Sequence, residues 1–197
     1  KSLKSDPKIV LAAVKNRGAA LEYASKSLRD NPEIAIEAIK QELPAFAYVG
    51  DKCKANRDVM MAYFKSARGD RYGSSDIYSS MHENLKTDRE LLLLAVESDR
   101  WAFYRANDVF KSDREILLTT LRASCGSYNA LSAAIEANDE FAKDREVWLE
   151  AMNNSEADWS LWEMDESLLA DRELMLLAIE QGGYTSLRDV SKSLKSD

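Results

Sequence analysis

Glycine, proline and cysteine are scarce in this sequence of 197 residues, which contains seven, three and two of them, respectively. So few glycines and prolines leave little material for the tight turns of a strand-rich fold. The two cysteines, Cys53 and Cys125, make neither a disulfide framework nor a metal set, and we interpret them as reduced thiols of a cytoplasmic protein. The sequence starts at Lys1 rather than at methionine, so we expect it to be a fragment of a longer protein.

Long apolar runs and a basic charge excess are missing as well. The longest wholly apolar run, Leu91 to Val96, is far shorter than the roughly 20 residues that cross a membrane. The formal net charge of −7 disfavours sequence-independent binding to nucleic acid or to anionic lipid, because both require clustered Lys and Arg. We therefore expect neither a nucleic-acid partner nor a membrane partner.

The residues of common catalytic and metal sites are also rare. Histidine occurs once, at His82, and zinc needs several Cys or His side chains at short spacing. No glycine-rich phosphate loop is present. We predict no metal, no cofactor and no enzymatic activity. Acidic pairs are plentiful, so a hydrolase that uses paired carboxylates is a less favoured alternative.

A short pattern returns along the whole sequence. It reads apolar residue, two variable residues, Asp or Asn, one variable residue, an acid and an aliphatic residue, and its Asp or Asn positions are 25–32 residues apart. Near-constant spacing of this kind is typical of a repeat array. The pattern predicts a single array over residues 1–197, with a partial repeat at 194–197 and full repeats that start near residues 3, 28, 53, 85, 110, 141 and 168.

Each Asp or Asn of the pattern predicts the start of a helix, because its side chain can accept hydrogen bonds from the free amides of the first turn. Pro7 and Pro32 follow two of these caps, where a missing N–H has no cost. Apolar residues three, four, five and eight positions past the cap predict a helix of nine or ten residues that is buried on most sides. A second helix follows after a short loop, as at Ala20 to Ala24 in the first repeat.

A single repeat buries too few apolar side chains to offset the entropy of ordering about 25 residues. Stability must therefore come from stacking of neighbouring repeats. The sequence predicts an all-α fold, specifically a right-handed α-solenoid of about seven two-helix repeats of 25–32 residues.

The first repeat carries a family resemblance, in Leu3 to Val14 and then in Gly18 to Ser25. It resembles a family of short tandem two-helix repeats of unknown function, whose repeats read Leu-x-x-Asp-x-Glu-Ile/Leu-x-Leu-x-Ala-Val and then Gly-x-Ala-Leu-x-Tyr-Ala-Ser. The resemblance covers the whole chain and implies an all-α array. It implies no activity and no catalytic residues.

Positions two, six and nine past each cap share one helix face, which we expect to be exposed. This face has mixed charge in the first three repeats and is mainly acidic in the last four. We name the following residues the acidic stripe: Glu90, Leu94, Glu97, Glu115, Glu146, Glu150, Glu173, Leu177 and Glu180. Our hypothesis is that the acidic stripe receives a basic segment of a partner protein, and the alternative is an ordinary solvated face.

Two long loops and two aromatic residues are further candidates for partner binding. The loops at 67–75 and 123–129 occupy the same place in their repeats, and insertions on one edge of an array are often binding loops. Their candidate contact residues are Arg68, Tyr72 and Tyr128. Tyr104 and Trp162 occupy a column that is otherwise polar or small, so we expect them to be exposed anchors for a partner.

Five repeats place Arg directly after the cap, at Arg57, Arg89, Arg114, Arg145 and Arg172. A row of helix N-termini with Arg could bind anions. We favour a different interpretation, in which these Arg side chains pair with Asp and Glu of neighbouring repeats.

The leading functional prediction is a non-catalytic protein–protein interaction scaffold that presents a concave stripe, acidic toward the C-terminus, and two projecting loops. The alternative is an accessory or spacer region beside a catalytic domain outside this sequence. Lys1–Asp6 and Lys192–Asp197 are the same six residues. The sequence thus begins and ends at equivalent points of the repeat, so we expect that the two ends of the array can stack head to tail. We expect the chain to be a monomer in solution.

Overall fold

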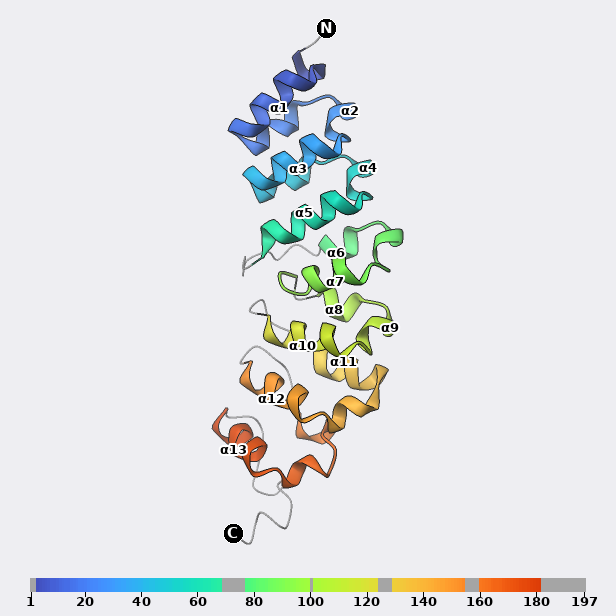
Figure 1. Cartoon of the computed structure of the whole chain (residues 1–197), viewed down its shortest axis with the longest axis vertical. Coiled ribbons are helices and arrows are strands. Elements are labelled where there is room, and N and C mark those ends of the chain that lie inside the picture. Colours follow the sequence, from blue (N-terminus) through green and yellow to red (C-terminus); the bar gives the residue numbers. More distant parts are fainter. Residues whose placement is uncertain (1–2, 69–76, 100, 124–128, 155–159, 182–197) are drawn as a thin grey trace. The chain divides into compact units, whose positions relative to one another are not determined.

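The computed structural model describes residues 3–68, 77–99, 101–123, 129–154 and 160–181. Every regular element within these ranges is a helix, which confirms the predicted all-α class (Figure 1). None of the described helices is long and apolar enough to cross a membrane. The chain divides into two compact parts, an N-terminal half of residues 1–98 and a C-terminal half of residues 99–197.

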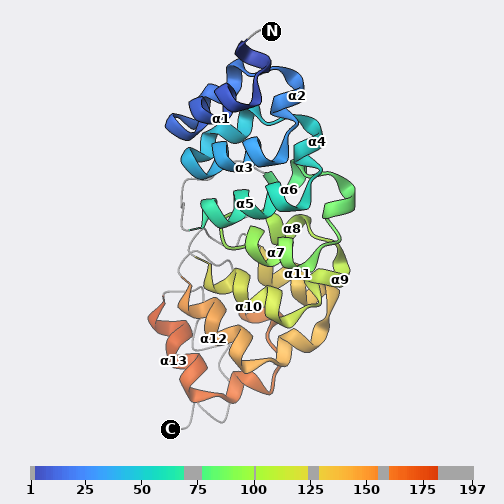
Figure 2. The ribbon, with the colours of Figure 1, turned by 45° about the horizontal axis from the view of Figure 1, so that its top comes forward.

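In the N-terminal half, the first helices of successive repeats contact one another in chain order and lie side by side (Figures 1 and 2). These first helices are α1 (Pro7–Asn16), α3 (Pro32–Gln41), α5 (Arg57–Ala67) and α7 (Arg89–Ala95). The shorter elements between them are the 3-10 helices η1 (Leu3–Ser5), η2 (Gly18–Tyr23), η3 (Leu43–Tyr48) and η4 (Glu83–Leu85), and the one-turn helices α2 (Lys26–Arg29), α4 (Asp51–Lys54) and α6 (Ile77–Ser80).

The C-terminal half repeats this order. Its first helices are α10 (Arg114–Arg122), α12 (Arg145–Asn153) and α13 (Arg172–Glu180), and α12 contacts both of the others. The remaining helices of this half are α8 (Ala102–Arg105), α9 (Asp108–Lys111), α11 (Ala130–Ala137), η5 (Asp139–Lys143), η6 (Leu161–Glu163) and η7 (Leu168–Ala170).

The predicted helix caps are confirmed. In α1, Oδ1 of Asp6 accepts hydrogen bonds from the amides of Lys8 and Ile9, at 2.9 and 3.3 Å. The equivalent side chain accepts from first-turn amides in each of the other first helices, at Asn31, Asn56, Asp88, Asp113, Asp144 and Asp171. An oxygen at this position satisfies donors that the helix itself leaves unpaired, so the cap fixes where each helix begins.

The predicted core columns are buried in most repeats. Three residues past the cap, the apolar side chain is at most 2 % exposed in every repeat from the second, at Ile34, to the seventh, at Leu174. Eight residues past the cap, it is at most 1 % exposed in every repeat from the first, at Val14, to the sixth, at Met152. The prediction is wrong at two positions, because Ile9 in α1 and Ile179 in α13 are each 44 % exposed. These two residues belong to the first and the last of the described first helices.

The second helix differs from the prediction of one continuous element. In the first repeat it is the 3-10 helix η2 followed by the separate one-turn helix α2, with Ala24 extended between them (φ −70°, ψ 154°). The amide of Ser25 donates to the carbonyl of Lys4 at 2.8 Å, and the equivalent amide of Gly50 donates to that of Arg29 at 2.9 Å. Because these amides bond to the preceding one-turn element, they are not available for a continuous helix.

Candidate functional site

A ladder of ion pairs links the starts of successive first helices. Nε of Arg57 donates to Oδ2 of the cap Asp88 at 2.6 Å, and its Nη2 donates to Oε2 of Glu90 at 2.5 Å. In the C-terminal half, Arg114 makes the same two contacts with Asp144 and Glu146, both at 2.6 Å. One guanidinium therefore holds the cap and the first-turn acid of the following repeat.

The same arrangement recurs at the next repeat, where Arg145 pairs with Asp171 at 2.7 Å and with Glu173. The predicted ladder is confirmed for Arg57, Arg114 and Arg145. The cap after Arg172 in the sequence is Asp197, which lies outside the described residues. A planar guanidinium suits this position because it donates two parallel hydrogen bonds in a fixed geometry.

The ladder keeps its carboxylates ionised. The hydrogen bond from Arg57 holds the pKa of Asp88 below its usual range, and Arg114 and Arg145 lower the pKa of Asp144 and Asp171 in the same way. Backbone amides of the capped helix add to this effect. These carboxylates are therefore poor proton donors near neutral pH, which suits a structural role.

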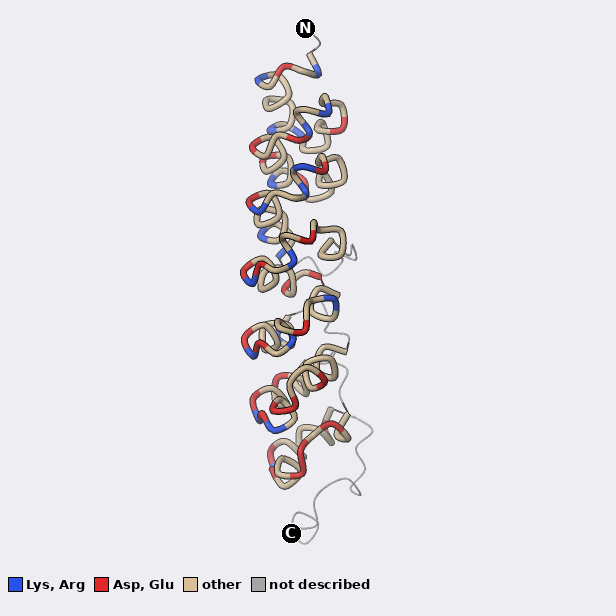
Figure 3. Tube along the Cα trace, turned by 90° about the vertical axis from the view of Figure 1, so that its right-hand side faces the viewer, with Lys and Arg blue, Asp and Glu red and all other residues tan. Residues whose placement is uncertain are grey.

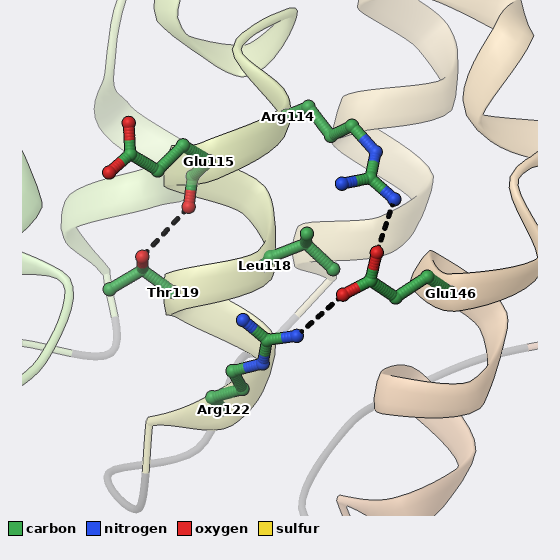
Figure 4. Close-up of a pocket in the computed structure, with 6 residues that line it drawn as sticks. All are labelled: Arg114, Glu115, Leu118, Thr119, Arg122 and Glu146. Carbon is green, nitrogen blue, oxygen red and sulfur yellow. Dashed lines mark hydrogen bonds and ion pairs between the residues drawn. The ribbon is translucent and has the colours of Figure 1, made fainter.

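A pocket of about 490 Å³ lies between α10 and α12 in the C-terminal half (Figure 4). Glu146 stands between two guanidinium groups, accepting from Arg114 at 2.6 Å and from Arg122 at 2.8 Å. Arg122 also donates to Glu150 at 2.8 Å, while the carboxylate of Glu115 points away from Glu146 (Figure 4). The charged groups that face one another across the pocket are thus paired to one another.

The side chains of the acidic stripe are exposed or half-buried at all nine positions. Five of its seven carboxylates, however, pair with Arg residues that precede them in the chain. Two of these pairs were not predicted from the sequence: Arg68 pairs with Glu97, and Arg122 pairs with Glu150. Acidic and basic positions lie next to one another along one edge of each half (Figure 3), so the stripe is less acidic than its own residues indicate.

The candidate loop residues divide between described and undescribed parts of the chain. Tyr72 and Tyr128 lie outside the described residues. Arg68 lies just after α5 and contacts Glu97 with Nη2 to Oε1 at 2.9 Å. Arg68 therefore forms an ion pair with a residue of the acidic stripe within the N-terminal half.

Large apolar side chains are exposed in the C-terminal half. Trp162 in η6 is 87 % exposed and Tyr104 in α8 is 48 % exposed, as expected from their column. Val109 in α9 is 81 % exposed and was not predicted. Nζ of Lys111 lies 5.9 Å from the centre of the Tyr104 ring, which places a cation over that aromatic face.

Two residue types that often mark chemistry have structural roles here. Cys53 is fully buried, and this burial raises the pKa of its thiol to about 11. His82 is exposed and caps η4. Within the described ranges, no group of three or more His, Cys, Asp or Glu side chains is arranged to hold a metal ion.

Comparison with known proteins gives one match. Searches of curated proteins and of solved structures found none. A family model matches residues 1–29, 88–135 and 144–195, which together cover more than half of the chain. The chain belongs to the family described as a domain of unknown function (DUF4116).

Proposed function

We propose that the chain is a non-catalytic protein–protein interaction scaffold, built as a right-handed α-solenoid of about seven two-helix repeats. The contacts between consecutive first helices within each half support this architecture. So does the recurrence of the Arg–cap ion pair at equivalent positions of both halves. Arrays of this kind bind partners along an extended surface rather than in a deep cavity.

The observation that carries the proposal is the exposure of Trp162, which leaves 87 % of a large aromatic side chain in solvent. Tryptophan and tyrosine are enriched among the residues that dominate binding energy at protein interfaces, and they are large, rigid and partly polar. Tyr104 and Val109 add exposed apolar surface in the same half. These three side chains are the principal contacts of the proposed partner surface.

The chemistry around Trp162 favours a basic segment as the partner. Three of the four residues that follow it in the sequence are acidic, namely Glu163, Asp165 and Glu166. A hydrogen bond from Ser167 lowers the pKa of Asp165, so this carboxylate stays ionised near neutral pH. A partner Lys or Arg would gain both the aromatic face and the neighbouring negative charge. The acidic stripe contributes less to this attraction, because five of its seven carboxylates already pair with Arg residues of the same chain.

Affinity capture with matched variants tests this function. The chain is immobilised as wild type, as Trp162→Ala with Tyr104→Ala, and as the control Tyr23→Ala, which removes a 63 % exposed aromatic from the N-terminal half. We expect proteins that wild type and the control retain equally and the double variant loses by about 30-fold, as for an interface hot spot of about 2 kcal/mol. Equal capture by all three chains would contradict the proposed surface.

The ladder favours a second candidate, an accessory or spacer region beside a catalytic domain. A spacer needs stiffness along the array, and ion pairs that join successive repeats supply contacts without a partner. In that case none of the three immobilised chains retains a protein reproducibly. The capture experiment therefore separates the two candidates.

A further inference from the structure

Three lysines occupy the same position of consecutive repeats in the N-terminal half. Lys15, Lys40 and Lys65 each lie nine residues past the cap, in the last turn of α1, α3 and α5, and all three are exposed. These helices contact one another in chain order and lie side by side (Figures 1 and 2). The three ammonium groups therefore follow one another along the edge where the first helices end, and we name them the lysine row.

The lysine row has no counter-charge bound to it. None of its members forms an ion pair with another described residue. In the C-terminal half the same position holds Arg122, which donates to Glu146 and to Glu150 of the following first helix, both at 2.8 Å. The chain thus neutralises the cation at this position in α10 and leaves it uncompensated in α1, α3 and α5.

A lysine at the end of a helix also interacts favourably with the helix dipole. This effect does not account for the row, because the other four repeats have different residues nine positions past the cap, namely Glu97, Arg122, Asn153 and Glu180. Two of these four are acidic, so the first helices of this chain do not require a cation at their ends. The run of three lysines is a property of the N-terminal half.

The surface beside the lysine row is shallow and carries little negative charge. One turn before the lysine, α1 has Ala12 and α5 has Ala62, whose small side chains leave room for a ligand. In α3 the equivalent residue is Glu37, so three positive charges face one negative charge. The acids in the first turns, Glu33 and Asp58, lie seven residues before the lysine of their helix, roughly 10 Å along its axis.

The spacing of the lysine row indicates the shape of its ligand. The axes of packed helices are about 8–10 Å apart, so the lysines recur at about that step. A segment in the polyproline II conformation has three residues per turn and rises about 3.1 Å per residue, which gives about 9 Å per turn. Acidic residues at every third position of such a segment lie on one side of it and match the row.

We propose that the lysine row binds an extended acidic segment of a partner protein, with Glu or Asp at every third position. Each carboxylate accepts a hydrogen bond from one ammonium group, and the segment runs across the ends of α1, α3 and α5. This surface lies in the other half of the chain from Trp162 and selects the opposite charge. The inference is independent of the partner surface proposed there, and either can fail without the other.

NMR titration of the isotope-labelled full chain with two synthetic peptides tests the inference. The spaced peptide, Glu-Pro-Ala-Glu-Pro-Ala-Glu, has its acids at the step of the row, and the block peptide, Pro-Ala-Glu-Glu-Glu-Pro-Ala, has the same charge with adjacent acids. We expect the spaced peptide to shift amides at the ends of α1, α3 and α5 with a dissociation constant of about 1–10 mM, as three exposed ion pairs allow. The block peptide should bind at least about threefold more weakly.

An absence of shifts up to about 10 mM spaced peptide would overturn the proposal. Equal binding of the two peptides would overturn it as well, because the match in spacing would then have no effect. Binding should also weaken as salt is added, since the contacts are between exposed charges.

Matched variants locate the binding. The triple variant Lys15→Gln, Lys40→Gln and Lys65→Gln should bind the spaced peptide at least about 10-fold more weakly, with circular dichroism unchanged. The control Lys52→Gln removes an exposed lysine of α4 and should leave binding unchanged. Glu37→Gln should strengthen binding about twofold, because it removes the carboxylate that competes with the peptide. Binding by the triple variant at wild-type strength would contradict the assignment.

Two further measurements separate an acidic protein segment from other anions. Tetrathymidylate has three phosphates and thus nearly the charge of the spaced peptide, and tighter binding of it at the row would assign the row to nucleic acid instead. Self-association of the wild type that the triple variant abolishes would assign the row to a second copy of the chain. Trp162→Ala with Tyr104→Ala should leave peptide binding unchanged, because these residues belong to the other surface.

Discussion

Gly18 lies where the chain leaves α1 and enters η2, and its backbone approaches the next repeat closely. A Cβ atom at this position would lie 2.5 Å from the carbonyl oxygen of Ala38 and 3.1 Å from Cβ of Glu42. The contacted oxygen belongs to the backbone of α3, so it cannot rotate away as a side chain would. Glycine is required here because only hydrogen fits between the two repeats.

We therefore expect Gly18→Ala to lower the free energy of unfolding by about 1–3 kcal/mol, the usual cost of overpacking. Urea denaturation followed by circular dichroism measures this change. Gly50→Ala is the matched comparison, because its Cβ would come closest to the side chain of Asp30 and would lie 3.2 Å from the backbone carbonyl carbon of Arg29, a longer backbone contact than the 2.5 Å at Gly18. A smaller loss for Gly18→Ala than for Gly50→Ala would argue against the close approach of the η2 and α3 backbones.

The caps show how far single residues predict the structure. Each predicted Asp or Asn begins a first helix, because the side-chain oxygen and the amides that it satisfies lie within three residues of one another. The exposure of the acidic stripe also follows from local helical spacing. Its pairing does not, because Arg122 meets Glu150 across 28 residues, and that distance closes only when the repeats stack.

At the scale of elements, the first helices are joined by apolar contacts and by the ladder. Every described rung connects the first residue of one helix with the cap and the first-turn acid of the next. The contact fixes the register of two neighbouring helices, since a shift by one residue would separate Arg114 from Asp144. The second helices of the first two repeats are instead broken into shorter pieces, where the amides of Ser25 and Gly50 donate to backbone carbonyls of the preceding short helix.

The break between η2 and α2 was not predictable from local sequence. Ala20 to Ala24 has the composition of a helix, and nothing within the segment ends it. The cause is the carbonyl of Lys4, which belongs to the element before α1 and accepts the amide of Ser25. Contacts of this kind depend on how repeats stack, so periodicity alone does not show them.

The ladder predicts a dependence of stability on pH. Because Arg114 lowers the pKa of Asp144 in the folded chain, the pair stabilises folding above the unfolded-state pKa of about 4, and this contribution is lost as pH falls through the lower folded pKa. Arg114→Gln should therefore be less stable than wild type at pH 7, by less than about 1 kcal/mol because solvent screens the pair. The difference should vanish in acid.

Thermal unfolding of both chains between pH 7 and pH 2 measures this effect. Asp144→Asn provides the matched background, since it retains the capping oxygen without the charge. Arg114→Gln should have a smaller effect in that background than in the wild type. A stability difference that is constant over the whole pH range would show that the ion pair contributes nothing.

At the scale of the whole molecule, the proposed array makes stability a sum over neighbouring repeats rather than the property of one central core. The two halves, residues 1–98 and 99–197, each contain a row of first helices with the same caps and the same buried columns. An array of this type tolerates the loss of a complete repeat, because the repeats on either side present equivalent surfaces to each other. A fold with a single non-repeating core does not.

Deletion of one complete repeat therefore tests the central claim most directly. Removing residues 26–50 joins Ser25 to Asp51, and Ser25 then takes the place of Gly50 as the cap of α4. It also brings Asn56 behind a helix that begins with Pro7, the combination already present at Pro7 and Asn31. The matched control removes only α3, Pro32–Gln41, which is a smaller loss that breaks the repeat register.

Thermal unfolding followed by circular dichroism compares the two deletions with the wild type. The array predicts that the chain without residues 26–50 keeps its helix content per residue and unfolds cooperatively, while the smaller deletion of α3 causes the larger loss of stability. Loss of cooperative unfolding in the complete-repeat deletion, with the α3 deletion tolerated equally or better, would contradict it.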